Sequence, residues 1–227
     1  MASGRPSPKR RGRMPLQRDT RAAILAAAAR EFGKNGQEGA RTQAIAKSAG
    51  VNIALLFYYF KNKKQIYNAV LGEVFQRWTE AVTPAMTEPE SAQKALLAYA
   101  SATFDFISQD PARARFVQLE FLRGPGAELR ALVKQYLLPF HQQFVRVIQA
   151  GVENGELLPV DPQQLTTTIK GLVISHFNNS SVIEMLTGQD PLAPAALARQ
   201  RRSVLEMIER VAFIKRPGNS KPRKEHA

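Results

Sequence analysis

The chain contains no cysteine among its 227 residues, and it has only three histidines. Without thiols, disulfide scaffolds, cysteine-ligated zinc and thiol catalysis are all excluded. The histidines, His141, His176 and His226, leave little room for a histidine-rich metal site. We therefore predict that the protein uses neither a metal nor another cofactor.

Long apolar runs are also absent. No stretch approaches the roughly 18 apolar residues that a membrane-spanning helix needs. The short run 22–29 follows basic residues, as in a signal peptide, but it continues without a break into charged residues. It places Ile24, Leu25 and Phe32 on one helical face, so an amphipathic helix is the better interpretation. We expect a soluble, cytoplasmic protein that does not associate with membranes.

Catalytic motifs are missing as well. The sequence has no glycine-rich phosphate loop, no Gly-x-Ser-x-Gly and no His-Glu-x-x-His. Its carboxylates are scattered as on a solvated surface, and only Glu120 and Glu184 raise a question of burial. We therefore expect a protein that is not an enzyme.

Positive charge is abundant and unevenly distributed. The net charge is +13, of which residues 1–21 carry +6 and residues 22–64 carry +5. Residues 65–212 carry −2, and the tail 213–227 carries +4. A near-neutral body with a basic front end is the distribution expected of a polyanion-binding module joined to a different kind of domain.

The rest of the pattern predicts helices throughout, and hence an all-α fold. The first helix is expected to begin near Arg18 or Asp19 and to end at Gly33, with Asn35-Gly36 as its stop signal. Pro139 predicts a kink or a split inside one of the later spans. Beyond the first three short elements, turn signals bound helical spans at 63–82, 90–108, 112–122, 127–154, 161–187 and 194–213.

Residues 40–60 have the pattern of a helix-turn-helix. Thr42 is a good N-cap for a short helix, which Gly50 ends because glycine takes the left-handed turn position without strain. Asn52 is expected to cap the next helix, and Leu56 and Phe60 face back into the core. An ordinary helical hairpin would satisfy the same short pattern.

Residues 23–71 resemble the TetR family of bacterial transcriptional regulators. The resemblance is carried by Arg30-Glu31-Phe32, Asn35-Gly36, Thr42, Ile45-Ala46, Ala49-Gly50-Val51-Asn52, Leu56-Phe57-Tyr58-Tyr59-Phe60 and Lys63. It implies an N-terminal helix-turn-helix DNA-binding domain followed by a helical ligand-binding and dimerisation domain. The expected divisions are a flexible basic arm (1–16), the DNA-binding domain (17–64), the helical body (65–213) and a basic disordered tail (214–227).

The same resemblance implies which residues contact DNA. Family members bind as dimers and place the helix that begins at Asn52 in the major groove. Phe57 stands where the family usually has tyrosine, and the apolar Ile53, Ala54 and Leu55 can at best press against thymine methyl groups. The predicted DNA-contacting residues are Arg10, Arg11, Arg13, Arg41, Thr42, Gln43, Asn52, Ile53, Ala54, Leu55, Phe57, Tyr58, Tyr59 and Lys63.

Specificity is therefore expected to depend on Gln43, the tyrosines, the basic arm and DNA shape. A glutamine can make a bidentate contact to adenine. The arm, with Arg10, Arg11 and Arg13, can lie along a narrow A·T-rich minor groove, although a solvated tail that aids solubility is the alternative.

The body offers candidates for two further roles, although a plain core or surface role remains open for each. Residues expected to face an apolar ligand cavity are Trp78, Phe104, Phe121, His141, Phe144, His176 and Asn179. Residues expected at a dimer interface are Leu165, Ile169, Leu172, Val173, Val204, Leu205 and Ile208. An intramolecular core face is the alternative for them, and both roles can hold because a helix can bury one side in each direction.

We interpret the sequence as a DNA-binding transcriptional regulator, a ligand-responsive repressor that acts as a homodimer. Its expected partners are a double-stranded DNA operator, a small-molecule effector and a second copy of itself. The alternative is a ligand-independent architectural DNA-binding protein, which would bind DNA of any sequence with similar affinity.

Overall fold

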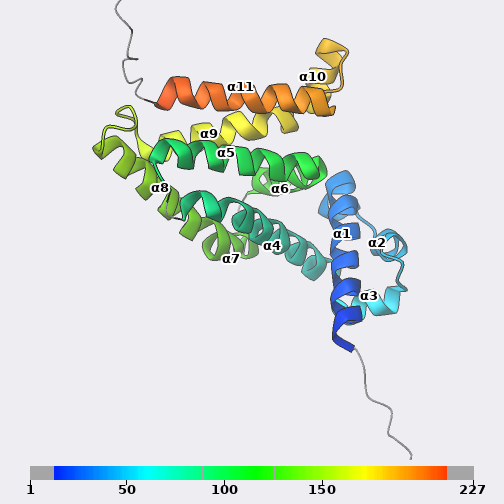
Figure 1. Ribbon diagram of the computed structural model, residues 1–227. Coiled ribbons are helices and arrows are strands. Elements are labelled where there is room, and N and C mark those ends of the chain that lie inside the picture. Colours follow the sequence, from blue (N-terminus) through cyan, green and yellow to red (C-terminus); the bar gives the residue numbers. More distant parts are fainter. Residues whose placement is uncertain (1–12, 88, 125, 214–227) are drawn as a thin grey trace, which may run out of the picture. The chain divides into compact units, whose positions relative to one another are not determined.

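The computed structural model describes residues 13–87, 89–124 and 126–213 (Figure 1). The predicted basic tail and most of the predicted arm, including Arg10 and Arg11, lie outside these ranges. Within them every element is a helix, apart from an isolated antiparallel bridge between Leu157 and Phe213, so the all-α prediction is confirmed. The chain divides into two compact units between Leu71 and Gly72.

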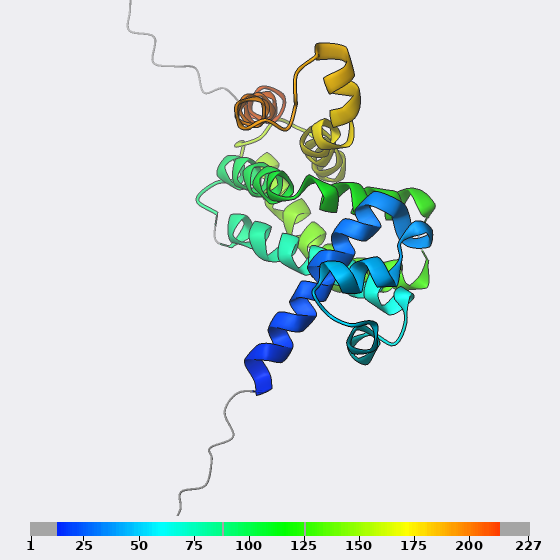
Figure 2. The same ribbon diagram turned by 90° about the vertical axis from the view of Figure 1, so that its right-hand side faces the viewer.

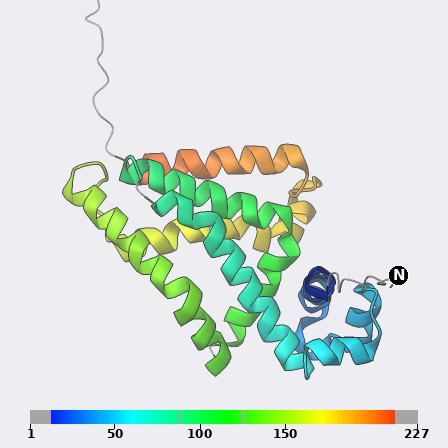
Figure 3. The same cartoon turned by 60° about the horizontal axis from the view of Figure 1, so that its bottom comes forward.

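The first unit contains α1 (Arg13–Gly39), α2 (Thr42–Ser48), α3 (Ile53–Tyr59) and the beginning of α4 (Lys63–Val82). In Figure 3, α1 is seen nearly end-on with α2 and α3 beside it. The core is apolar and includes the fully buried side chains of Ile24, Phe32, Ile45 and Leu56. These are the positions that helical periodicity places on the inner faces.

The first helix differs from its predicted bounds at both ends. It begins at Arg13, inside the segment expected to be an arm, and it continues through Gly33. The helical backbone is interrupted at Gly36, which has φ 67° and ψ 178°. Glycine adopts this conformation without strain. The interruption of the helix therefore lies at the Asn35-Gly36 stop signal and not at Gly33.

The turn between α2 and α3 follows local rules. Gly50 has φ 68°, as the sequence predicts, and Asn52 caps α3 by accepting a hydrogen bond from the Leu55 N–H at 2.7 Å. The prediction that Thr42 caps α2 is wrong, because Thr42 is already the first helical residue. The Glu31 carboxylate, from α1, instead accepts a hydrogen bond from the Arg41 N–H at 3.1 Å.

The second unit begins with the remainder of α4 and is built around α5. Helices α8, α9 and α11 all pack on α5, and α10 projects beside α9 and α11 (Figure 2). The elements after α4 are η1 (Thr83–Met86), α5 (Ala92–Gln109), α6 (Pro111–Arg123), α7 (Ala127–Leu132), the π-helix η2 (Val133–Leu137), α8 (Leu138–Glu153), α9 (Pro162–Asn178), α10 (Ser180–Thr187) and α11 (Pro194–Ala212).

Two of the predicted long spans are divided. The expected break near Pro139 is present, because α7 passes through the π-helix η2 before α8 begins at Leu138. The span 161–187 was expected to be one helix, but it is interrupted at Asn179, whose backbone leaves the helical region. Its side-chain amide donates a hydrogen bond to the Ser175 carbonyl oxygen at 2.8 Å and so helps to end α9.

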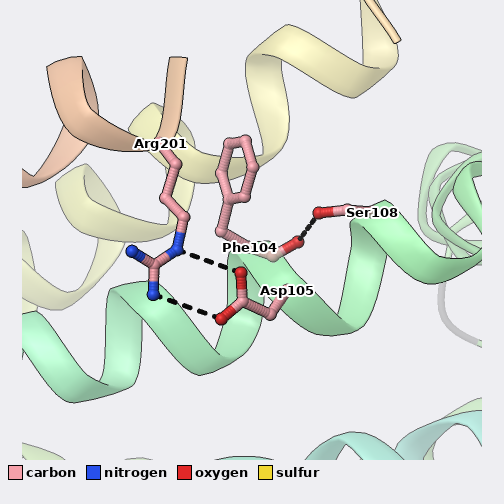
Figure 4. A network of polar contacts seen from close by, with 4 residues as sticks. All are labelled: Phe104, Asp105, Ser108 and Arg201. Atoms are coloured by element: carbon pink, nitrogen blue, oxygen red, sulfur yellow. Dashed lines mark hydrogen bonds and ion pairs between the residues drawn. The ribbon is translucent and has the colours of Figure 1, made fainter. Parts of the chain in front are cut away.

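A polar contact ties α11 to α5. The Arg201 guanidinium donates two hydrogen bonds to the Asp105 carboxylate, at 3.0 and 3.2 Å, next to the Ser108 hydroxyl, which bonds the Phe104 carbonyl oxygen (Figure 4). Both charged side chains are partly exposed, so the ion pair contributes at most about 1 kcal/mol. Its bidentate geometry mainly fixes the orientation of α11 on α5.

Candidate functional site

The outer face of α3 is apolar and exposed. Leu56 is the residue of α3 that points into the core, whereas Tyr58 is 75% exposed and lies edge-to-face against Tyr59. Ile53, Leu55 and Phe57 are also exposed, with Ala54 beside them. Large apolar side chains in water on one short helix are typical of a surface that binds a partner.

Basic and polar side chains accompany this face. Arg41, Gln43 and Lys47 on and before α2 are exposed, as are Lys61 and Lys64 at the start of α4. The structure therefore leaves nearly all the predicted DNA-contacting side chains that it describes open to solvent, with Thr42, Tyr59 and Lys63 half-buried. The side chains of Arg10, Arg11 and Arg13 lie outside the described part.

Two predicted DNA contacts have partners within the protein. Asn52 uses its side-chain oxygen to cap α3. Lys63 donates hydrogen bonds from Nζ to the carbonyl oxygens of Glu38 and Ala40, at 3.0 and 3.2 Å. Each therefore has a structural role in the first unit, whatever it contributes on DNA.

The second unit contains a partly open cavity of about 470 Å³. Its volume and its mostly apolar lining are those of small-molecule sites. The π-helix η2 contributes to the wall, and such local distortions of helices often occur at functional sites. The lining residues are Val74, Phe75, Trp78, Tyr99, Thr103, Phe106, Ile107, Ala114, Val117, Gln118, Phe121, Val133, Leu137, Leu138, Phe140, His141, Thr166, Lys170, Ile174 and Asn178.

Three of the seven predicted ligand-facing residues, Trp78, Phe121 and His141, are in this lining. The other four are not among its described residues. Phe104 and Phe144 are buried in the core, where Phe104 packs against Phe177 and Phe144 against Tyr99.

The two remaining predicted ligand residues have backbone partners. His176 is buried, and its Nε2 lies 2.9 Å from the Pro191 carbonyl oxygen. Asn179 is exposed and ends α9. For these residues the simpler interpretation, a core or surface role, fits the structure.

Helix α9 contributes one row of residues to the cavity. Thr166, Lys170, Ile174 and Asn178 recur every four residues along α9, so they share one helical face that lines the cavity. Asn178 is also a polar residue that the sequence suggests for a cavity, whereas Thr166 and Lys170 were not predicted. Their four-residue spacing from Asn178 is the signal that could have found them.

Two cavity side chains have shifted pKa values. Burial raises the pKa of Tyr99 to about 12, and the neighbouring Thr103 hydroxyl opposes part of that rise. Loss of water around its ammonium group lowers the pKa of Lys170. The Lys170 side chain as a whole is exposed. Because its ammonium group has nevertheless lost part of its surrounding water, that group lies at the border of the cavity.

Family models match parts of both compact units of the chain. The family model described as "Bacterial regulatory proteins, tetR family" matches residues 24–70. The model described as "Tetracyclin repressor-like, C-terminal domain" matches residues 93–208, half of the chain. The chain belongs to the TetR family.

Proteins similar to this TetR-family chain carry names that describe them as transcriptional regulators. The HTH-type transcriptional regulator RutR of Escherichia coli K12 is 30% identical over 166 residues, which cover 73% of this chain and 77% of RutR. The fold is shared with the ketosteroid transcriptional regulator KstR2 of Mycobacterium tuberculosis (TM-score 0.71, 17% identity, 86% and 95% coverage).

A further solved structure is that of FadR from Bacillus subtilis, in complex with stearoyl-CoA. Its TM-score is 0.64 at 25% identity, and the match covers 82% of this chain and 96% of FadR. The TetR helix-turn-helix and the all-helical body are thus shared with solved relatives.

The predicted dimer residues of this TetR chain are mostly core. Leu165, Ile169 and Val173 on α9 are buried, and so are Val204 and Ile208 on α11, while Leu172 and Leu205 are half-buried. All seven belong to or pack against the hydrophobic core of the second unit. A core role therefore describes the five buried residues, whereas Leu172 and Leu205 keep part of their surface open to solvent. The dimer role of these helices stays a prediction.

Within the described part of this TetR chain, no group of three or more His, Asp or Glu side chains is arranged to hold a metal ion. None of its described helices combines the length and hydropathy needed to cross a membrane.

Proposed function

We propose that this TetR-family regulator is a ligand-responsive repressor that acts as a homodimer. The observation that carries the proposal is the mostly apolar cavity of the second unit, in a chain whose first unit exposes an apolar and basic helix-turn-helix. A protein that only bound DNA would have no need of a cavity this large, because unfilled apolar space costs packing energy.

On DNA, α3 would lie in the major groove with its exposed Ile53, Leu55 and Tyr58 against the bases. These apolar contacts can favour thymine methyl groups, and Gln43 can contact an adenine edge. The basic arm with Arg10, Arg11 and Arg13 would add affinity that depends strongly on salt.

Helix α4 supplies a route for coupling. It contributes to both compact units, and its second half places Val74, Phe75 and Trp78 in the cavity lining. A ligand that binds one arrangement of α4 better than another shifts the population toward that arrangement. We propose that in the favoured arrangement the two α3 helices of the dimer no longer match DNA half-sites roughly 34–36 Å apart, so that DNA is released.

The effector would be a largely apolar small molecule. This follows from the cavity lining, and the stearoyl-CoA bound to FadR is a precedent for such a ligand in a related structure. The binding site lies within a single protomer, since all described lining residues belong to the second unit.

The dimer would bury exposed apolar side chains of α10 and α11. Met185 and Leu186 on α10 are 77% and 81% exposed, and Val182 is exposed on the same helix. Met207 and Val211 on α11 add exposed apolar area. A second copy of the chain would cover these side chains and remove them from water, which favours association.

The test is a footprint on the DNA upstream of the protein's own gene, with and without a panel of metabolites. A protected site of defined sequence that one metabolite abolishes supports the proposal. Similar affinity for unrelated DNA, with no effect of any metabolite, would identify the architectural alternative instead. Protection that appears only with a metabolite would reverse the sign of the coupling.

A further inference from the structure

Resting on the proposed function, we propose that the effector is an elongated amphipathic anion. Its acidic group binds the Lys170 ammonium at the border of the cavity, its apolar body lies along α9, and its far end donates a hydrogen bond to Asn178. Each residue has an unmet electrostatic requirement in the cavity.

Lys170 is a cation that has no counterion in the part of the chain that the structure describes. Among the described residues it forms no ion pair, and its Nζ lies 5.3 Å from the centre of the Phe121 ring. A ring face attracts a cation only weakly compared with a carboxylate. Partial loss of water lowers the pKa of Lys170, which means that its charged form is under-stabilised and would gain from an anion.

Asn178 supplies the second requirement. Its side-chain oxygen is buried and has no hydrogen-bond donor among the described residues. Buried polar atoms normally have partners, so an unpartnered amide oxygen in a cavity lining points to a polar group of a ligand.

The two groups define a length. Thr166, Lys170, Ile174 and Asn178 form one row along α9 within the lining. With 1.5 Å of rise per residue, the eight residues from Lys170 to Asn178 span about 12 Å. Ile174 lies between them, and Phe121 and Trp78 are other apolar members of the lining. A straight-chain ligand with a polar group at each end fits this order of polar, apolar and polar side chains along α9.

The sign of the ligand's charge follows from the lining. The described lining residues include Lys170 and His141 but neither aspartate nor glutamate. A cationic ligand would find no carboxylate there, whereas an anionic one gains a charge-assisted hydrogen bond to Lys170.

The cavity contains its own reporter, because Trp78 is the single tryptophan of the chain and belongs to the lining. Quenching of Trp78 fluorescence measures binding in the full-length protein without DNA. The probes are 10-hydroxydecanoate, whose extended length suits the row, decanoate, which lacks the terminal hydroxyl, and methyl 10-hydroxydecanoate, which lacks the charge.

The variants separate charge from packing. Lys170→Met keeps the length of the side chain without its charge, and Lys170→Arg keeps the charge. Asn178→Leu removes the buried acceptor. Lys134→Met, on the π-helix η2 but exposed and absent from the described lining, is the matched control.

We expect saturable quenching by 10-hydroxydecanoate that weakens about tenfold or more in Lys170→Met, as for loss of one charge-assisted hydrogen bond. Lys170→Arg should stay within about threefold of the wild-type affinity because it keeps the positive charge. Lys134→Met should stay within the same range, about threefold, because Lys134 is absent from the described lining. The methyl ester should bind weakly and equally to wild type and Lys170→Met. Asn178→Leu should abolish the preference for 10-hydroxydecanoate over decanoate.

Equal affinity of the acid for wild type and Lys170→Met overturns the proposal, as does an ester that binds as well as the acid. Absence of saturable quenching by the acid also overturns it. None of these results bears on repression itself, because the footprint with and without metabolites tests that function separately.

Discussion

Lys63, the first residue of α4, donates a hydrogen bond from its ammonium group to the Ala40 carbonyl oxygen at 3.2 Å. A second bond, to the Glu38 carbonyl oxygen at 3.0 Å, ties the same ammonium group to the end of α1. A cation at a helix C-terminus satisfies carbonyl groups that have no helical partner and interacts favourably with the helix dipole. Lys63 therefore holds α1 and α4 together inside the first unit.

Replacing Lys63 by methionine should lower the free energy of unfolding by about 1–2 kcal/mol, because two carbonyl groups lose a charged donor in a half-buried place. Urea titration of the DNA-free protein measures the change. Lys61→Met, at an exposed position nearby, should leave stability unaltered. If Lys63→Met weakens only DNA binding and leaves urea unfolding unchanged, the residue acts on phosphate alone.

Gln43→Ala should reduce operator affinity and relax the preference at one base pair, at a cost of about 1–3 kcal/mol for a lost bidentate contact to adenine. Competition with operators changed at single positions measures it. Lys47→Met, on the same helix and also exposed, should weaken binding to all sequences alike and reduce the salt slope by about 1. Unchanged affinity and preference in Gln43→Ala would show that this side chain reads no base.

Gly151→Ala and Gly171→Ala should have opposite effects on stability. A Cβ at Gly151 would collide with the Ala92 Cβ and lie 2.9 Å from Leu157 Cδ1, so overpacking should cost about 1–3 kcal/mol. A Cβ at Gly171, within α9, meets nothing within 4 Å, and alanine there should add about 0.5–1 kcal/mol through helix propensity. Thermal unfolding of both variants beside wild type checks the pair; equal melting temperatures would contradict the packing at α8.

Tyr99 should make stability depend on pH above 10. Its pKa is about 12 in the folded protein, against 10.0 as the ordinary value, so the unfolded chain loses this proton first. The stability that the buried neutral phenol contributes is complete below pH 10 and is lost as the pH rises toward 12. The loss amounts to about 2–3 kcal/mol. Urea unfolding at pH 9 and pH 11.5 should show a smaller decline in Tyr99→Phe than in wild type; parallel declines would assign the effect to other groups.

Leu186→Glu should weaken self-association about tenfold or more, because it places a charge in the apolar α10 surface that we propose to be covered by a second copy. Sedimentation over a range of concentrations measures the dimer constant. Gln142→Glu adds the same charge at an exposed position of α8 and should not change it. A dimer constant unaffected by Leu186→Glu would place the interface elsewhere.

Local rules were enough to predict the helix-turn-helix. Gly50 adopts a positive φ and Asn52 caps α3, and both depend on residues only a few positions away. The apolar spacing of Ile45 and Leu56 likewise places them in the core. Where a distant group intervened, the prediction was wrong: Glu31 of α1 bonds the Arg41 N–H at the start of α2, and Thr42 does not cap it.

The cavity depended on more than spacing. Trp78 and Phe121 were selected as aromatic residues, but so were Phe104 and Phe144, which pack into the core. A helical pattern says that a side chain is turned inward, and only the neighbouring helices decide whether it meets a packed side chain or open space. Asn178 is a polar residue that the sequence does suggest for the cavity, whereas Lys170 was missed because a lysine beside an apolar seam has the appearance of solvated surface.

The sequence by itself determined the all-α fold, the helix-turn-helix and the concentration of positive charge in the first 64 residues, because each follows from composition or from short-range backbone and side-chain rules. Only the tertiary structure decided that Leu165, Ile169 and Val173 pack within one protomer while Met185 and Leu186 remain exposed. An apolar stripe removes itself from water equally well against its own chain or a second copy. Which surface covers it depends on how the helices are arranged around α5.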